Sequence, residues 1–343
     1  MAKCKSFSLQ WHLTNKCDQR CKHCYVHNGK EKTEEEEFGL VQCVSILDDF
    51  ILFCRRINRT PNLSLTGGDP LLYPDIWKFL KIAHEKNIPF SILGNPFHVN
   101  DEVCTKLHEL GCTYYQMSLD GLEKTHDALR KPGSWKATMD ALKILNRHGI
   151  RTVIMSTVSK INYREIPELI EIVVKNEVNT YAFARYCPTR SDTKQNIGPE
   201  EYRRFLDKVW KTFQRFSKSG TSFTLKDHLW TPYLWEKGLL NIKSNTDRKC
   251  IHGGCHLGTS HLTLLPEGTF FACRRFESPL GNARDDSFFN AFFGKKMSRY
   301  RNMTEIEGCN KCKLLQHCRG CRAVTYGTTG NYFAKDPQCW IKT

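Results

Sequence analysis

The chain has 343 residues, of which 40% are hydrophobic and 25% are charged, so we expect a packed, water-soluble core. No apolar run reaches the roughly 18 residues of a membrane span, and the first residues lack the apolar stretch of a signal peptide, which excludes a membrane protein and favours the cytoplasm. The formal net charge is +15, but Lys and Arg are scattered without a run of five. This indicates a general attraction for anionic partners and argues against a nucleic-acid site.

Short β-branched or aromatic runs alternate with longer amphipathic segments through the first two thirds of the chain. The runs predict strands at 7–13, 62–66, 89–94, 113–119, 151–159 and 180–186. The amphipathic segments predict helices near 34–57, 74–87, 101–110, 135–148, 163–176 and 199–217. Strands and helices that alternate in this way form right-handed βαβ units and a parallel sheet. Six units are too few to close an eight-stranded barrel, so the predicted fold class is α/β with a partial (β/α)6 barrel.

Distinctive motifs follow four of the predicted strands. The first strand is followed by CxxxCxxC, the second by GGDP, the third by GNP and the fourth by DG. Parallel α/β folds bind their ligands at the carboxyl ends of the strands. These motifs are therefore predicted to face one common mouth.

The pattern changes after about residue 220. Residues 220–343 are rich in cysteine, glycine and short basic stretches, and the run at 261–275 predicts a β-hairpin whose turn is PEG. We therefore predict two domains, a barrel at 1–219 and a smaller cysteine-rich α+β domain at 220–343.

Three cysteines, Cys17, Cys21 and Cys24, follow the first strand closely. Seventeen cysteines in a chain without a secretion signal favour metal binding over disulfides, because the cytosol keeps thiols reduced. Thiolates suit a soft metal, and three of them leave one metal position open. His23 or His27 would close a structural Cys₃His zinc site, so the loop by itself is compatible with a closed zinc or an open iron–sulfur cluster.

With Tyr25 beside its last cysteine, this loop resembles the signature of the radical S-adenosylmethionine (SAM) family. In that family the fourth iron of a [4Fe–4S] cluster is left free, and the amino and carboxylate groups of SAM chelate it. An electron then cleaves SAM to a 5′-deoxyadenosyl radical, which abstracts hydrogen from an unactivated C–H bond. The resemblance implies an enzyme that uses SAM and a barrel of the radical SAM type.

Two further motifs match what the resemblance implies for SAM binding. The segment TGGDP resembles the family's GGEP motif, in which glycines allow close backbone approach to the ligand and an acidic residue holds the SAM amino group. In this chain the glycines are Gly67 and Gly68, and Asp69 replaces the commoner, longer glutamate.

The segment SLDG resembles the part of the fourth strand that meets the carboxylate or ribose of SAM. It contributes Ser118 and Asp120. Arg130 is predicted to pair with the SAM carboxylate, and Arg185, near the end of the sixth strand, is a further candidate for binding an anionic group.

The C-terminal cysteines resemble the SPASM domain, an extension of radical SAM enzymes that carries two auxiliary [4Fe–4S] clusters. Twelve residues, Gly268 and four residues separate Cys255 from Cys273, and a CxxCxxxxxCxxC run begins at Cys309; its last gap is two residues where three is usual. The resemblance implies Cys250, Cys255, Cys273 and Cys321 as ligands of one cluster, and Cys309, Cys312, Cys318 and Cys339 as ligands of the other. By itself, 309–321 is also compatible with a treble-clef or ribbon zinc site.

Cys187 follows the sixth predicted strand in the segment FARYCPTR. A thiol at that strand end is predicted to face the mouth where the radical forms. Since an S–H bond is weak, Cys187 is a candidate hydrogen-atom donor for an epimerising enzyme. The alternative is an ordinary small residue before Pro188.

SPASM proteins of this size most resemble maturases of ribosomally made peptides, which form thioether or other cross-links, epimerise α-carbons or oxidise side chains. The stretch ILGNPFHV resembles a subgroup with short, cysteine-rich precursor peptides. Expected partners are such a peptide, a reductant protein such as flavodoxin or ferredoxin, and a separate leader-recognition protein, because no winged-helix module fits before Cys17 or after Cys339.

Two other functions stay open on the sequence. One is a radical SAM enzyme that acts on a small molecule, such as a haem or redox-cofactor precursor. The other is a non-catalytic zinc protein that binds nucleic acid through its basic surface.

Overall fold

The computed structural model describes residues 6–26, 37–188, 192–242 and 251–342. Within these ranges one ten-stranded sheet has the order β10-β9-β8-β1-β2-β3-β4-β5-β6-β7. The strands are β1 Ser6–Thr14, β2 Thr60–Gly67, β3 Phe90–Leu93, β4 Cys112–Ser118, β5 Thr152–Val158, β6 Thr180–Arg185, β7 Ser222–Thr224, β8 His261–Leu264, β9 Thr269–Phe271 and β10 Pro279–Asn282. The neighbours from β8 to β7 are parallel, and only β9 and β10 join in antiparallel pairs.

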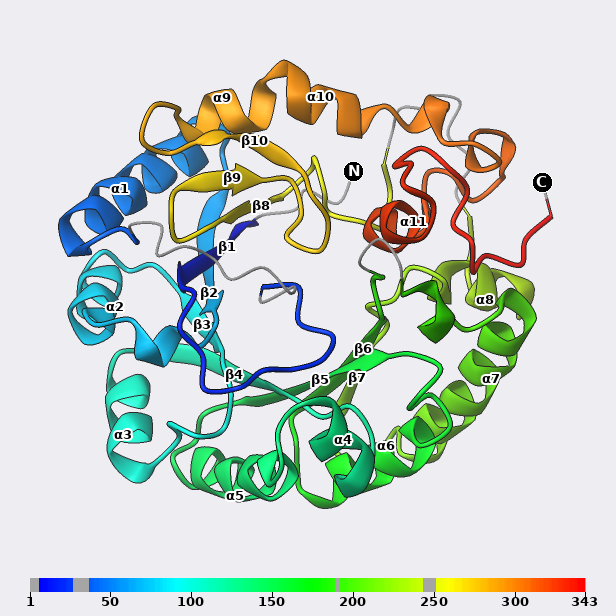
Figure 1. The fold of residues 1–343 in the computed structure, drawn as a ribbon, viewed down its shortest axis with the longest axis horizontal. Helices are drawn as coiled ribbons and strands as arrows, with labels where there is room; N and C mark the ends of the chain where they lie inside the picture. Colours follow the sequence, from blue (N-terminus) through cyan, green and yellow to red (C-terminus); the bar gives the residue numbers. More distant parts are fainter. Residues whose placement is uncertain (1–5, 27–36, 189–191, 243–250, 343) are drawn as a thin grey trace.

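Helices surround the curved sheet on its outer side (Figure 1). The helices of the described ranges are α1 Leu40–Arg56, α2 Ile76–Glu85, α3 Asp101–Glu109, α4 Glu123–Leu129, α5 Ser134–Arg147, α6 Ile166–Lys175, α7 Pro199–Arg215, α8 Trp230–Glu236, α9 Phe288–Phe293, α10 Lys295–Arg301 and α11 Arg322–Thr329. In the described part of the chain, none of these helices is long and apolar enough to cross a membrane.

The predicted α/β fold with a partial barrel is confirmed, because six parallel βα units follow one another in the predicted order. Their ends agree with the predicted ranges within a few residues, except that the first described helix begins at Leu40, while residues 34–36 lie outside the described ranges. The sequence did not predict the short elements: β7 has three residues, and α4 and α8 have seven each. Segments this short show less than two full turns of helical periodicity.

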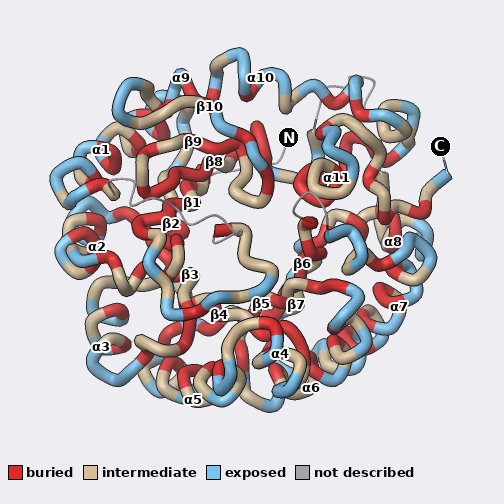
Figure 2. The backbone as a smooth tube through the Cα atoms, in the orientation of Figure 1, coloured by how far each residue is buried: buried red, intermediate tan, exposed pale blue. Residues whose placement is uncertain are grey.

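The two faces of the sheet differ in burial. On β5, Thr152, Ile154 and Ser156 are buried against the helices, whereas Val153 and Met155 are only half-buried on the inner side. Strand residues alternate between faces, so the apolar core fills the layer between sheet and helices. Figure 2 shows buried backbone along the strands and exposed backbone on the outer helices. The side chains on the inner face are not covered by these helices and can therefore line a binding site.

The sheet continues across the predicted domain boundary. Strand β7 pairs with β6, and β8 pairs in parallel with β1, from Ser8 opposite His261 to Trp11 opposite Leu264. The predicted hairpin is present as the antiparallel pair β8 and β9. The division into 1–219 and 220–343 stays a prediction, since the two parts share one sheet.

Candidate active site

Cys17, Cys21 and Cys24 lie in the loop that follows β1. The three thiols interact electrostatically with one another, Cys17 with Cys21 and Cys21 with Cys24. Burial raises the pKa of Cys17 to about 11 and also raises that of Cys21, so both are protonated thiols at neutral pH in the absence of metal. Three soft donors in one loop fit an iron–sulfur cluster, whose binding would release these protons.

The end of β2 holds this loop through backbone contacts. The Gly68 and Asp69 amides donate to the carbonyls of Thr14 and Lys16, each at 2.8 Å. A Cβ atom on Gly68 would lie 2.0 Å from the Lys16 oxygen, and Gly67 has a φ of +142° and would collide with Thr14. The sequence reasoning attributed these glycines to close approach of the ligand. In the structure they are required by close approach of the cluster loop itself.

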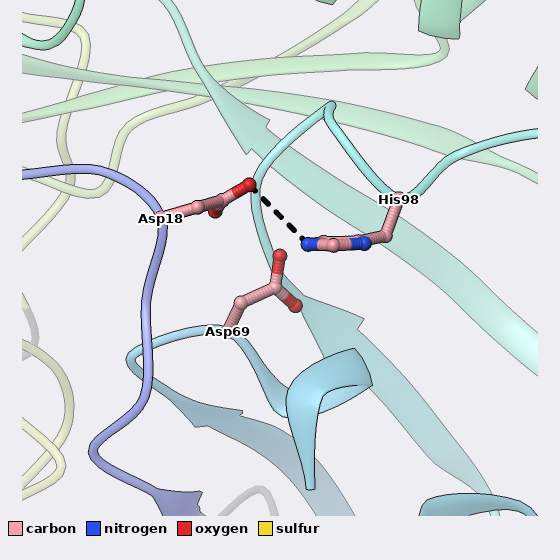
Figure 3. Close-up of side chains that lie close together, drawn as sticks. All are labelled: Asp18, Asp69 and His98. Carbon is pink, nitrogen blue, oxygen red and sulfur yellow. Dashed lines mark ion pairs between the residues drawn. The ribbon is translucent and has the colours of Figure 1, made fainter.

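Asp69 is completely buried, and its carboxylate accepts from the amides of Leu71 at 3.0 Å and Asn95 at 3.3 Å. Asp18 and His98 lie beside it, so that the three side chains place one ligand atom each within 4.8 Å of one another (Figure 3). Burial raises the pKa of Asp69 to about 6, and the charge of Asp18 adds to the effect. The sequence indicated the GNP loop here but not Asp18 or His98.

Asp120 is completely buried and anchors Arg130. One carboxylate oxygen accepts from Arg130 Nε at 2.6 Å and lies 3.2 Å from His23 Nε2, while the other accepts from the Thr157 amide at 2.7 Å. Although burial alone would raise it, Arg130 and His23 hold the pKa of Asp120 well below its usual range. An Arg130 terminal nitrogen lies 3.7 Å from Cys21 Sγ. Asp120 therefore positions Arg130 beside the cluster loop, and direct contact of Asp120 with SAM stays a prediction.

Tyr25 and Ser118 lie near the same end of the barrel. The Tyr25 ring lies 6.4 Å from the His12 ring and 5.6 Å from the Arg274 guanidinium carbon. Ser118 is the half-buried last residue of β4, and by strand alternation it shares the inner face with Gln116. Both positions are compatible with the predicted contacts to SAM.

Arg185 does not offer a free guanidinium to SAM. Its side chain is 1% exposed, and it donates to Asp227 at 2.9 Å, to both oxygens of Asp336 at 2.9 and 2.8 Å, and to Gln338 at 3.1 Å. Arg185 was predicted to bind an anionic group of the cofactor. In the structure it binds two carboxylates of the protein, Asp227 and Asp336. These contacts link the end of β6 to the C-terminal segment.

The second predicted auxiliary group is assembled. Cys309, Cys312, Cys318 and Cys339 line one small cavity together with apolar side chains and Asp336. The described cysteines are all free of disulfides. Four convergent thiols in a water-poor cavity fit a [4Fe–4S] cluster, and they fit tetrahedral zinc equally well.

The first predicted auxiliary group is gathered around His228, whose side chain hydrogen-bonds to Cys255 and Cys321. Cys273 lies close enough to both thiols to interact with them electrostatically. The fourth predicted ligand, Cys250, lies outside the described residues. Three predicted ligands thus meet at one place, which fits a cluster.

Cys187 lies at this same auxiliary site. Its thiol hydrogen-bonds to Cys321, and its pKa is raised by burial and by that contact. Arg275 packs against the pair, with Nη1 3.8 Å from Cys321 Sγ. The hydrogen-donor role of Cys187 stays a prediction, and the structure places the thiol beside the auxiliary group.

The inner face of the barrel encloses a cavity of about 470 Å³. Most of its lining side chains can form hydrogen bonds; among them are Asn62, Thr113, Gln116, Arg151, Thr180 and Lys226. Gln116 and Met155 lie in the middle of β4 and β5, whereas Thr180 begins β6 and Arg151 precedes β5. The cavity therefore extends from the amino ends of the strands to the middle of the barrel.

The chain is similar in sequence to known protein families and to known proteins. Residues 11–173 match the radical SAM superfamily, and residues 255–322 match SPASM, described as an iron–sulfur cluster-binding domain. The "AdoMet-dependent heme synthase" of Methanosarcina barkeri is 26% identical over 96% of this chain and 95% of its own length. The "Mycofactocin maturase MftC" of Mycobacterium ulcerans is 25% identical over 96% of this chain and 87% of its own length.

A solved structure shows the same fold. Streptococcus suis SuiB bound to its precursor peptide SuiA superposes with a TM-score of 0.75 at 20% identity, covering 98% of this chain and 76% of SuiB. The thiol loop after β1, the SPASM cysteines and these matches agree with one another. The chain belongs to the radical SAM superfamily of enzymes and carries a C-terminal SPASM domain.

Proposed function

We propose that this enzyme removes a hydrogen atom from a ribosomally made peptide and so starts a cross-link, an epimerisation or an oxidation. When bound and reduced, a [4Fe–4S] cluster with SAM supplies the 5′-deoxyadenosyl radical that such a step requires. The similarity to MftC and the fold shared with peptide-bound SuiB support a peptide substrate.

The observation that carries the proposal is the barrel cavity. Its hydroxyl and amide side chains, such as Thr113, Asn62 and Gln116, match the hydrogen-bonding groups of an extended peptide. The hydrogen-bonding groups of the cavity are therefore compatible with a peptide substrate.

The proposed roles of the site residues follow from their positions. Cys17, Cys21 and Cys24 bind the cluster and leave one iron free. Arg130, held by Asp120, presents its terminal nitrogens beside the cluster and binds the carboxylate of SAM. Tyr25 and Ser118 line the SAM site. With the two auxiliary groups, we expect three [4Fe–4S] clusters and about twelve iron atoms per chain.

Asp69 and Asp18 together are proposed to bind the ammonium group of SAM. Asp69 is one methylene shorter than the glutamate of the family motif, and two of its acceptor positions are used by backbone amides. Asp18 adds a second carboxylate at the same point (Figure 3). His98 Nε2 already lies 3.3 Å from Asp18, and an ammonium group at this point would add a cation beside Asp69, whose pKa is raised by burial.

We expect Asp69→Asn to weaken SAM binding at least about tenfold while leaving the iron content unchanged, because a charge-assisted hydrogen bond is lost and no metal ligand is removed. Equilibrium dialysis with labelled SAM and iron analysis of the reconstituted protein measure both quantities. Asp75→Asn is the matched control, because Asp75 is a partly exposed carboxylate paired with Lys78. Iron loss in the Asp69 variant would show that this loop is structural.

Co-expression tests the function directly. Short, cysteine-rich peptides encoded beside this protein's gene are expected to change mass or stereochemistry when co-expressed with it, and to stay unchanged with the Cys17, Cys21 and Cys24 triple alanine variant. Mass spectrometry and chiral amino-acid analysis report these changes. If no such peptide changes, the peptide proposal is wrong.

A second candidate is oxidation of a haem precursor. It is favoured by the similarity to the Methanosarcina barkeri heme synthase, which extends over 96% of the chain. Anaerobic incubation with an iron porphyrin tetracarboxylate, followed by absorption spectra and mass analysis, separates it from the first. In either case the electron is proposed to come from a flavodoxin or ferredoxin, and a separate protein would recognise a peptide leader.

A further inference from the structure

The barrel cavity contains positive charge without a compensating carboxylate. Among its described lining residues are two cations, Arg151 and Lys226, and no Asp or Glu. The ion pairs found in the described ranges involve neither of them. By contrast, Arg130 and Arg185 are both neutralised by buried carboxylates.

Lys226 lies deep in the barrel yet is reached by water through the cavity. It follows β7 by two residues, and Thr224 of that strand pairs with Ala182 in the middle of β6. The surrounding protein and the positive charge of Arg275 lower the pKa of Lys226 to about 8. An anion beside the ammonium would offset this effect by direct attraction.

We propose that the barrel cavity binds a carboxylate group of the substrate and that Lys226 is the residue that binds it. Arg151 stands at the strand-start end of the same cavity and adds attraction for an anion entering there. The threonine and amide side chains of the lining would supply further hydrogen bonds to the carboxylate and its neighbours. The proposal rests on the proposed function, because it assigns the cavity to the substrate of the same reaction.

The proposed carboxylate site can be tested with a small dicarboxylate, without knowledge of the full substrate. Glutarate is titrated against the anaerobically reconstituted full chain by ligand-observed NMR, with the uncharged glutaramide as the matched ligand. Glutarate is expected to bind wild type at least tenfold more tightly than Lys226→Met, and glutaramide is expected not to bind. Lys226→Arg should retain binding, and Lys143→Met, an exposed lysine on α5, should behave as wild type.

Several outcomes would overturn the proposal. It fails if wild type does not bind glutarate, if Lys226→Met binds it within twofold of wild type, or if glutaramide binds equally well. It also fails if Lys226→Met loses iron or alters the electron paramagnetic resonance of the reduced clusters, since Lys226 would then serve the nearby auxiliary group.

Competition identifies where the carboxylate comes from. The peptide acetyl-Gly-Glu-Gly-amide is expected to displace glutarate, and its Gln counterpart is expected not to. Displacement by a porphyrin tetracarboxylate alone would assign the site to tetrapyrrole propionates. Because glutarate binding is measured without turnover, a correct cavity assignment remains visible even if no peptide is modified and the proposed function fails.

Discussion

A chain in which Cys17, Cys21 and Cys24 are all alanine is expected to bind about a third less iron and to form no 5′-deoxyadenosine from SAM. These thiols are the thiol donors that the described cluster loop offers, and Asp69 and Arg130 are fixed around them by hydrogen bonds. Iron analysis and chromatography of the products formed with dithionite measure the two effects.

The matched control replaces Cys309, Cys312 and Cys339, which line the second auxiliary cavity. That variant is expected to lose a similar share of iron while it still cleaves SAM, because its thiols lie away from the loop after β1. If the first variant kept its SAM cleavage, the open iron would have to be elsewhere.

Replacing Arg185 by methionine is expected to destabilise the fold by about 3–5 kcal/mol, since it leaves Asp227 and Asp336 as buried, unpaired carboxylates. Asp336 also accepts from the Cys321 amide at 2.8 Å, so the first auxiliary group should load less iron as well. The thermal midpoint and the iron content of the purified protein report these losses.

An exposed pair provides the control for this prediction. Arg147→Met removes one of the two partners of Asp101 on the surface, the other being His148, and should shift the midpoint by only a fraction as much, because solvent screens that pair. Adding Asp227→Asn and Asp336→Asn to the Arg185 variant should recover part of the loss. An equal shift for Arg147→Met and Arg185→Met would refute a special role of the buried network.

The sequence predicted the repeating part of the fold well. Alternating burial along β5 and one apolar face on α7 leave clear periodic signals, and both segments are long enough to show them. The pairing of β8 with β1 gave no such signal. Strand order between distant segments depends on tertiary packing, which one-dimensional periodicity does not contain.

The parts of the site that depend on the spacing of residues along the chain could be predicted from the sequence. The thiol motifs indicated two groups that the structure assembles within its described ranges, and GGDP indicated the loop beside them. The partners of a buried charged side chain could not be predicted from the sequence. Arg185 was predicted to bind a ligand anion, but its guanidinium donates to Asp227 and Asp336, which lie 42 and 151 residues away in the chain. The sequence did not predict a role for His98 or Asp18, because their proximity to Asp69 arises only from the folding of the chain.

The parallel pairing of β8 with β1 also determines when the barrel becomes complete during synthesis. The ribosome makes β1 first, but the strand that covers one of its edges is made about 250 residues later. Until then, β1 presents unpaired backbone groups along that edge, and Phe7 lacks its ring contact with Phe292. The cluster loop begins at the end of that strand, and the contact of its Tyr25 with Arg274 forms only when most of the polypeptide has been made. A barrel released at residue 219 would therefore be an aggregation-prone intermediate.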